Sequence, residues 1–237
     1  MQRSTVVTLS VLVLGALAFG GWMWWQDAEA ERARVEREER REREQAVRLV
    51  RQREESMSLM PEALTGVALG MTVEEVRATG HRLEPSSSRP PEGLELTMYE
   101  ERLTSGAQMM FGFSRGSGHL QQIQVMSLLP RVEAIAPHLQ AMNERYGTPS
   151  GIWDCPDTQG LPTRRFTWRH AQTAISDVFL LYNGRASLTL YIATPDTIGR
   201  SLRMSHCAPV PRERLDQFPT ASPEQIQHAT VEATGGG

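Results

Sequence analysis

Residues 173–194 read TAISDVFLLYNGRASLTLYIAT, and this stretch decides the fold. Asn183-Gly184 stands between two mixed apolar and polar runs, and this dipeptide favours a two-residue turn because both positions accept a positive φ. Apolar residues alternate through the second run, at Leu188, Leu190 and Ile192. Alternation of this kind places them on one face of a strand. The stretch therefore predicts a β-hairpin with strands at 173–182 and 186–194.

The same pattern extends toward the N-terminus. A third strand is expected at 164–170, where Phe166 and Trp168 alternate with polar residues. Ahead of it a helix begins at Pro130 and ends before Gly147, because proline fits a first helical turn and glycine ends helices. Its apolar residues follow helical spacing, at Val132, Ile135, Ala136, Leu139, Met142 and Tyr146. Residues 129–207 thus predict one helix followed by three strands.

An earlier part of the chain repeats this arrangement. Thr72-Val73-Glu74-Glu75 is a capping box, in which threonine and glutamate side chains bond the free backbone N–H groups of a helix start. Gly80 ends that helix, and a proline- and serine-rich loop follows at 84–93. The strands expected next are 95–101, 106–114 and 119–127. The repeat units are therefore about 61–128 and 129–207.

Two successive units of this kind predict an α+β domain over 61–207 that arose by internal duplication. We expect the strands to form one antiparallel sheet with both helices packed on a single face. That arrangement buries the apolar side of the sheet and of each helix together.

Within the first unit, Gly112-Phe113-Ser114-Arg115-Gly116 spells G-x-S-x-G, the sequence of a hydrolase nucleophile elbow. That motif requires a turn from a strand into a helix. Residues 119–127 alternate as a strand instead, so the segment is a hairpin connection equivalent to Asn183-Gly184. We expect Ser114 to be a turn residue without a catalytic role.

An uncharged apolar run of 21 residues occupies positions 5–25. At about 1.5 Å per residue it extends roughly 30 Å, the thickness of the hydrocarbon core of a bilayer. We expect a transmembrane signal-anchor at 1–26. The alternative is a cleaved signal peptide with its site at Ala16-Leu17-Ala18 or Ala28-Glu29-Ala30, which would leave a soluble periplasmic protein.

Two features of the sequence predict opposite orientations of this segment in the membrane. Arginines just after the span favour a cytoplasmic C-terminal side under the positive-inside rule. A short N-terminus before a long domain is a common arrangement for export. We expect the second, with the domain in the periplasm of a bacterium and the anchor in the inner membrane. All 25 basic residues are arginine, a bias typical of GC-rich bacterial genomes.

Charged helix formers dominate residues 27–60, where Glu39 and Arg43 are one of several pairs spaced by four. We expect a solvated helical stalk. No apolar heptad is sustained, although a short coiled coil that forms a homodimer stays an alternative. Residues 208–237 are rich in Pro, Ser, Thr and Gly and predict a mostly disordered tail, with a brief helix near Ser222-Pro223.

Composition excludes several classes of function. The net charge of −3 implies no bulk attraction to nucleic acid. The chain has no glycine-rich phosphate loop between a strand and a helix, and its six histidines stand in unlike contexts. We expect neither a cofactor nor catalysis.

The two cysteines, Cys155 and Cys207, flank the strands of the second unit. In an exported domain they predict a disulfide, which over a loop of about 50 residues stabilises by roughly 4 kcal/mol at most. The alternative is a zinc site from Asp154, Cys155, His206 and Cys207. Because C-x-x-C and H-x-x-x-H spacings are missing, we expect no metal.

Aromatic and arginine side chains are frequent in the second unit. Most are explained as core or sheet residues, but such side chains also dominate the binding energy of protein interfaces. The candidates for a partner-binding surface are Trp153, Trp168, Arg165, Arg169 and Tyr191.

Residues 64–78, LTGVALGMTVEEVRA, carry the pattern Gly66-Val67-x-Leu69-Gly70-Met71-Thr72-x-x-Glu75-Val76. The pattern resembles the SmpA/OmlA small-lipoprotein domain, whose relatives occur in tandem in β-lactamase-inhibitor-like proteins. The resemblance covers 61–127, with a looser second copy. Members of that family help to assemble outer-membrane proteins. They carry a lipobox cysteine near the N-terminus, whereas the first cysteine here is Cys155, so lipid anchoring does not carry over.

The resemblance implies a non-enzymatic binding module of the cell envelope. Together with the anchor, it predicts a membrane-tethered protein whose extracytoplasmic domain binds an envelope protein or peptide. Binding would use the sheet face or an edge strand. The alternative function is an enzyme or metal-dependent site around Cys155 and Cys207.

Overall fold

A computed structural model describes the backbone of residues 2–88, 90, 94–104, 106–157, 159–215 and 217–227. Within these ranges it describes the side chains of Glu29 and of residues 31 onward. The chain divides into two compact units, Met1–Val50 and Arg51–Gly237.

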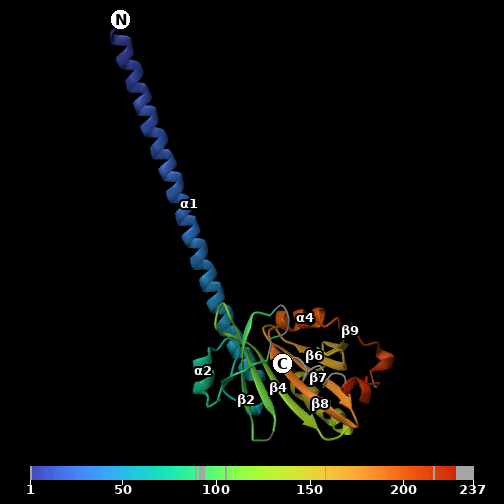
Figure 1. Cartoon of the computed structure of the whole chain (residues 1–237). Coiled ribbons are helices and arrows are strands. Elements are labelled where there is room, and N and C mark those ends of the chain that lie inside the picture. The colour runs from blue at the N-terminus through green and yellow to red at the C-terminus, as the bar shows by residue number, and fades with distance from the viewer. Residues whose placement is uncertain are drawn as a thin grey trace. The chain divides into compact units, whose positions relative to one another are not determined.

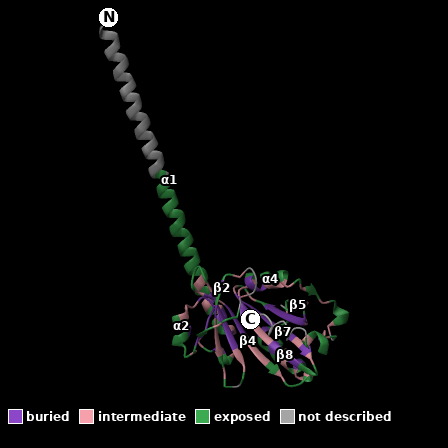
Figure 2. Ribbon diagram, in the orientation of Figure 1, coloured by how far each residue is buried: buried purple, intermediate pink, exposed green. Residues whose placement is uncertain are grey.

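A single long helix, α1 (Gln2–Leu59), makes up the described part of the first unit and continues into the second (Figure 1). Residues 31–48 are exposed, and Arg43 pairs with Glu39 at 3.2 Å (Figure 2). Among the residues with described side chains, no helix combines the length and the apolar character needed to cross a membrane. The predicted transmembrane segment at 1–26 lies outside those residues.

The second unit is an α+β fold whose described residues form a nine-stranded antiparallel sheet. The strand order is β1-β2-β3-β4-β8-β7-β6-β5-β9. The strands are β1 (Glu84–Pro85), β2 (Leu96–Arg102), β3 (Gln108–Ser114), β4 (Leu120–Leu129), β5 (Gly151–Pro156), β6 (Pro162–Arg169), β7 (Ala174–Tyr182), β8 (Arg185–Ala193) and β9 (Ala208–Pro209). The helices of this unit are α2 (Val73–Ala78), α3 (Ile135–Tyr146) and α4 (Pro195–Met204), with 3-10 turns at Glu62–Leu64, Val132–Ala134 and Arg212–Arg214.

The six strands expected from the sequence are confirmed as β2, β3, β4, β6, β7 and β8. Asn183 and Gly184 take φ values of 48° and 71°, so the β7–β8 turn has the backbone that this dipeptide favours. Ser114 ends β3 at a hairpin, where its N–H donates to the carbonyl of His119. The sequence analysis expected no strand at β5, which pairs with both β6 and β9.

The main core lies on one face of the sheet, beneath α2 and α3. The Thr72–Glu75 capping box forms and starts α2, which buries Val76. From α3, Ile135, Met142 and Tyr146 pack in the same core as Phe111 of β3 and Phe179 of β7. The expectation that both helices share one face is therefore confirmed for α2 and α3.

A further helix, α4, lies on the opposite face and corrects the prediction of helices on a single face. Thr194 caps its first turn, and Pro195 occupies a position where a helix needs no N–H donor. Ile198 packs against Ala174 and Ala193. Their strand neighbours Ile175 and Ile192 lie in the core beneath α3. Since successive strand residues point to opposite faces, α4 covers the other side.

The C-terminal segment corrects a second prediction, because residues 208–215 and 217–227 are not a disordered tail. Phe218 packs against Phe166 and Phe179 of the main core, with ring centroids 5.9 and 6.1 Å apart. Ala221 is buried, and its N–H donates to the carbonyl of Leu181. The brief helix expected near Ser222 is present at 223–227, and residues 228–237 lie outside the described part.

The last turns of α1 belong to the domain, so the domain begins near Arg51 instead of residue 61. Ser56 is fully buried and its Oγ accepts the N–H of Leu69 at 3.0 Å. Arg53 donates to both carboxylate oxygens of Glu75 and to the carbonyl of Gly70. These polar contacts escape a prediction that is based on apolar spacing.

Candidate functional site: the sheet face around Arg165

One row of side chains crosses six neighbouring strands on the sheet face that carries α4. Residues directly opposite each other in adjacent strands are paired, and the pairs connect without a gap. From β5 to β3, this cross-strand row consists of Trp153, Arg165, Val178, Thr189, Met126 and Gln108.

Helical segments cover the sheet on both sides of the cross-strand row. On one side, Ile198 and Leu202 of α4 pack with Tyr191. On the other side, Ala221 and Ile226 pack with Leu161 and Leu180. Every member of the row except Arg165 is half-buried. Leu128, which lies two residues after Met126 in β4 and on the same face, is 66% exposed. The row is therefore an accessible strip of the face, with apolar groups at its centre.

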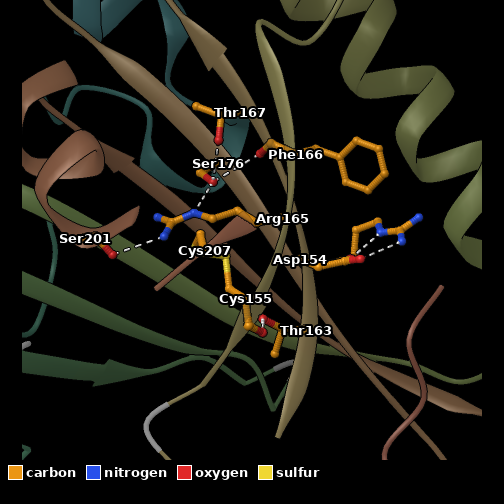
Figure 3. Close-up of a disulfide and its surroundings, with 10 residues drawn as sticks. Asp154, Cys155, Thr163, Arg165, Phe166, Thr167, Ser176, Ser201 and Cys207 are labelled. Atoms are coloured by element: carbon orange, nitrogen blue, oxygen red, sulfur yellow. Dashed lines mark hydrogen bonds and ion pairs between the residues drawn. A yellow bond between two sulfur atoms is a disulfide. The ribbon is translucent and has the colours of Figure 1, made fainter. Parts of the chain in front are cut away.

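Arg165 is the charged member of the row, and it is only 4% exposed. Its Nε donates to Ser176 Oγ at 2.6 Å, and its Nη1 donates to Ser201 Oγ of α4 at 3.0 Å (Figure 3). The guanidinium stands 5.2 Å from the centre of the Tyr191 ring. Burial lowers the pKa of Arg165, and the interaction with Tyr191 acts in the opposite direction.

No described carboxylate pairs with this guanidinium, and Nη2 of Arg165 is buried without a hydrogen-bond partner. A buried charge without a counter-charge is costly, because the interior solvates ions poorly. Arg165 therefore has a donor group, Nη2, that no described residue of the domain uses.

The preceding residue gives the opposite case. Arg164 is also fully buried, but on the other face of β6. It binds both oxygens of Asp154, at 2.9 and 3.2 Å. Its remaining donors reach the carbonyls of Arg214, Leu215 and Gln217 at 2.9 Å each. Arg164 is thus a structural residue that fixes the C-terminal segment.

The predicted disulfide is present between Cys155 of β5 and Cys207, 52 residues apart. It lies on the same side of β6 as Arg165, whereas Phe166 projects to the other side (Figure 3). Cys207 follows the end of α4 by three residues, so the disulfide attaches that end of α4 to β5. Both sulfur atoms are used in the bond, so neither is a free thiolate in this structure.

The other members of the proposed zinc site do not converge either. Asp154 is bound to Arg164, and His206 is exposed. Within the described ranges, no group of three histidine, cysteine or acidic side chains could hold a metal.

The candidates for a partner surface separate into three groups. Trp153, Arg165 and Tyr191 come together on the face that carries α4, and Arg169 is exposed at the end of β6. Trp168 is wrong as a surface candidate, because it is 1% exposed in the core and donates from Nε1 to the carbonyl of Gly147.

Sequence reasoning missed the rest of this site. Met126, Val178 and Thr189 carry no motif, although strand alternation from the Asn183-Gly184 turn would have placed the last two on one face. Ser201 could not be found, because α4 itself was not predicted.

An ionisable pair also lies on the opposite face of the sheet, which carries the main core. His138 of α3 and Asp177 of β7 approach within 2.8 Å, between Nε2 and Oδ2. Asp177 is fully buried and its Oδ1 lacks a partner. Burial raises the pKa of Asp177, while the hydrogen bond and charge of His138 act in the opposite direction.

Comparison with known proteins gives no match: no family model fits the sequence, and neither a curated protein nor a solved structure is significantly similar to the chain.

Proposed function

We propose that this chain is a membrane-tethered protein of the bacterial cell envelope whose domain binds another envelope protein or peptide, without catalysis, through the cross-strand row. The observation that carries the location is the disulfide between Cys155 and Cys207. Structural disulfides persist in oxidising compartments such as the periplasm and are rare in the cytosol. The apolar run at 5–25 supplies the anchor in this proposal.

The cross-strand row supports binding through the sheet face. Six strands at a spacing of about 4.8 Å give a strip roughly 24 Å long, the length of a helix of about 16 residues. Tryptophan, tyrosine, methionine and arginine are enriched in the cores of protein interfaces. Trp153, Arg165, Met126 and the neighbouring Tyr191 bring these residue types together.

The edges of the sheet offer less to a partner. The described edge strands, β1 and β9, have two residues each and cover the middle of β2 and β5. Val210 extends the second edge by donating its N–H to the carbonyl of Ile152. Short edge strands protect a sheet against strand addition, which favours the face as the binding surface.

The proposal includes an internal duplication and a relationship to the SmpA/OmlA domain. The strand order is symmetric about the β4–β8 pair, with β3 and β2 on one side and β7 and β6 on the other. Each three-stranded meander follows a helix, α2 or α3, and both helices pack into one core. This symmetry is what two adjacent copies of one unit would produce.

Photo-crosslinking in cells tests the proposed binding surface. A photoreactive phenylalanine analogue replaces Thr189 at the centre of the row, and in a second strain it replaces Glu133, which is exposed next to α3. Illumination is expected to give a discrete adduct with one envelope protein at Thr189 and none at Glu133. Equal adducts at both positions, or none at Thr189, would count against binding through this face.

A further inference from the structure

Building on the proposed function, we infer that Arg165 receives a carboxylate of the partner segment that lies along the cross-strand row. Arg165 is fixed by Ser176 on its own sheet and by Ser201 on α4, while Nη2 has no protein partner. Guanidinium groups bind carboxylates through two parallel hydrogen bonds. Because Nη2 is buried, a carboxylate reaches the guanidinium only by displacing Ser201 of α4 from Nη1, after which Nη1 and Nη2 supply the two donors.

The surroundings favour a carboxylate over other groups. The described acids near the site are occupied, since Asp154 binds Arg164 and Asp157 Oδ1 accepts the N–H groups of Gln159 and Leu161. The Tyr191 ring lies 5.2 Å from the guanidinium, Trp153 is the cross-strand neighbour of Arg165, and Arg165 is only 4% exposed, so water has little access to the guanidinium. A charge pair formed in such a place is strengthened by the low dielectric.

The position of Arg165 in the row determines toward which end of the row the partner places its carboxylate. Val178 is one strand away and Met126 is three strands away. At about 4.8 Å per strand, the partner places its carboxylate about 5 Å from one apolar group and about 14 Å from another. The partner is thus a short amphipathic segment with an acidic residue toward the β5 end of the row.

Peptide selection on the full chain, purified with its disulfide intact, tests this inference. A random dodecapeptide library is selected on the wild type, on Arg165→Gln and on Arg169→Gln. Arg169 is the matched control, because it lies on the same face of β6 and is exposed. We expect acidic residues at a fixed distance from apolar ones in peptides from the wild type and Arg169→Gln, and no acidic preference from Arg165→Gln.

A second measurement does not depend on a protein variant that could misfold. In the best selected peptide, the acidic residue is changed to its amide, and affinity for the wild type is expected to fall about 30-fold, as when one member of a buried charge pair is removed. The same change is expected to leave affinity for Arg165→Gln unaltered.

The possible failures are distinct. Peptides whose binding is abolished by Met126→Asp but shows no acidic preference would overturn the role of Arg165 and leave the binding face in place. Selection of no peptide that depends on Met126 would overturn both the inference and the proposed function.

Discussion

Arg164 and Arg165 are neighbours in sequence with the same side chain and nearly the same burial, yet their energetics differ. Arg164 meets a carboxylate and three carbonyls, so its charge and all its donors are compensated. Arg165 meets hydroxyl groups and an aromatic ring but no described carboxylate. Alternation along β6 sends the two side chains to opposite faces and causes the difference.

Methionine substitutions are expected to separate these roles. Arg164→Met should lower the free energy of unfolding by about 3–5 kcal/mol. Asp154 loses its bidentate partner and keeps only Arg214 at 3.6 Å, and the carbonyls of residues 214, 215 and 217 lose their donors. Arg165→Met should change it by less than about 1 kcal/mol, since removing an uncompensated buried charge offsets the lost hydrogen bonds. Urea unfolding measures both, with exposed Arg169→Met as the control. Equal losses for the two buried arginines would contradict this account.

Asp177 should make stability depend on pH in a defined direction. Below its ordinary pKa of 3.8 the carboxyl is protonated in both states and contributes nothing. Because burial raises the folded-state pKa of Asp177, the unfolded chain releases this proton first as pH rises. The free energy of unfolding therefore decreases as the pH rises from 3.8 to the pKa of Asp177 in the folded state. The total decrease is about 1.4 kcal/mol for each unit by which the folded-state pKa exceeds 3.8.

The variant Asp177→Asn isolates this contribution. The stability of the variant relative to the wild type is expected to rise from acid to neutral pH, because the wild type alone acquires a buried charge. Urea unfolding at several pH values measures the difference. His138 and Tyr146 also face Asp177, so His138→Gln is measured alongside. A difference that is constant with pH would show that burial does not control this carboxyl.

At the scale of elements, the six strands of the two repeat units could be predicted, whereas β1, β5, β9 and the polar attachments could not. The predicted strands show alternation, and Asn183-Gly184 gives a strong turn signal between β7 and β8; both kinds of signal are local in sequence. The C-terminal segment, in contrast, is held by Phe218 and by backbone carbonyls that bond Arg164. Backbone carbonyls leave no trace in composition, so the segment was predicted as disordered.

The candidate site shows the same division. Aromatic and arginine content pointed to Trp153, Arg165 and Tyr191, which lie on one face of the sheet, with Arg165 paired across strands with Trp153 and stacked on Tyr191. It also pointed to Trp168, because composition does not distinguish a core aromatic residue from an exposed one. The site is completed by α4, whose short amphipathic pattern was not recognised.

The end of α1 offers a matched test of element docking. Ser56 is buried and its Oγ accepts the N–H of Leu69, whereas Ser58 is exposed and bonds within its own helix. Ser56→Ala should cost about 1–3 kcal/mol, because the Leu69 N–H is left unsatisfied in the interior. Ser58→Ala should change the unfolding free energy by less than about 0.5 kcal/mol. Similar values for both would place the start of the domain after α1.

At the scale of the whole molecule, the proposed function joins an apolar segment, a charged helix and a disulfide-closed domain. The disulfide is the part of this assembly that depends on the compartment. It closes a loop over the strands β6, β7 and β8 and over α4, and these strands carry three of the six residues of the cross-strand row. The state of the two cysteines in cells therefore bears on the location and on the integrity of the binding face.

Thiol labelling with a membrane-impermeant maleimide, in intact cells and spheroplasts, is the most direct test of the claim that an oxidised domain lies outside the cytoplasm. We expect Cys155 and Cys207 to be unreactive before reduction and to be labelled in spheroplasts after reduction. Free thiols that react only after lysis would contradict the account, because they would place the domain in the cytoplasm without its disulfide.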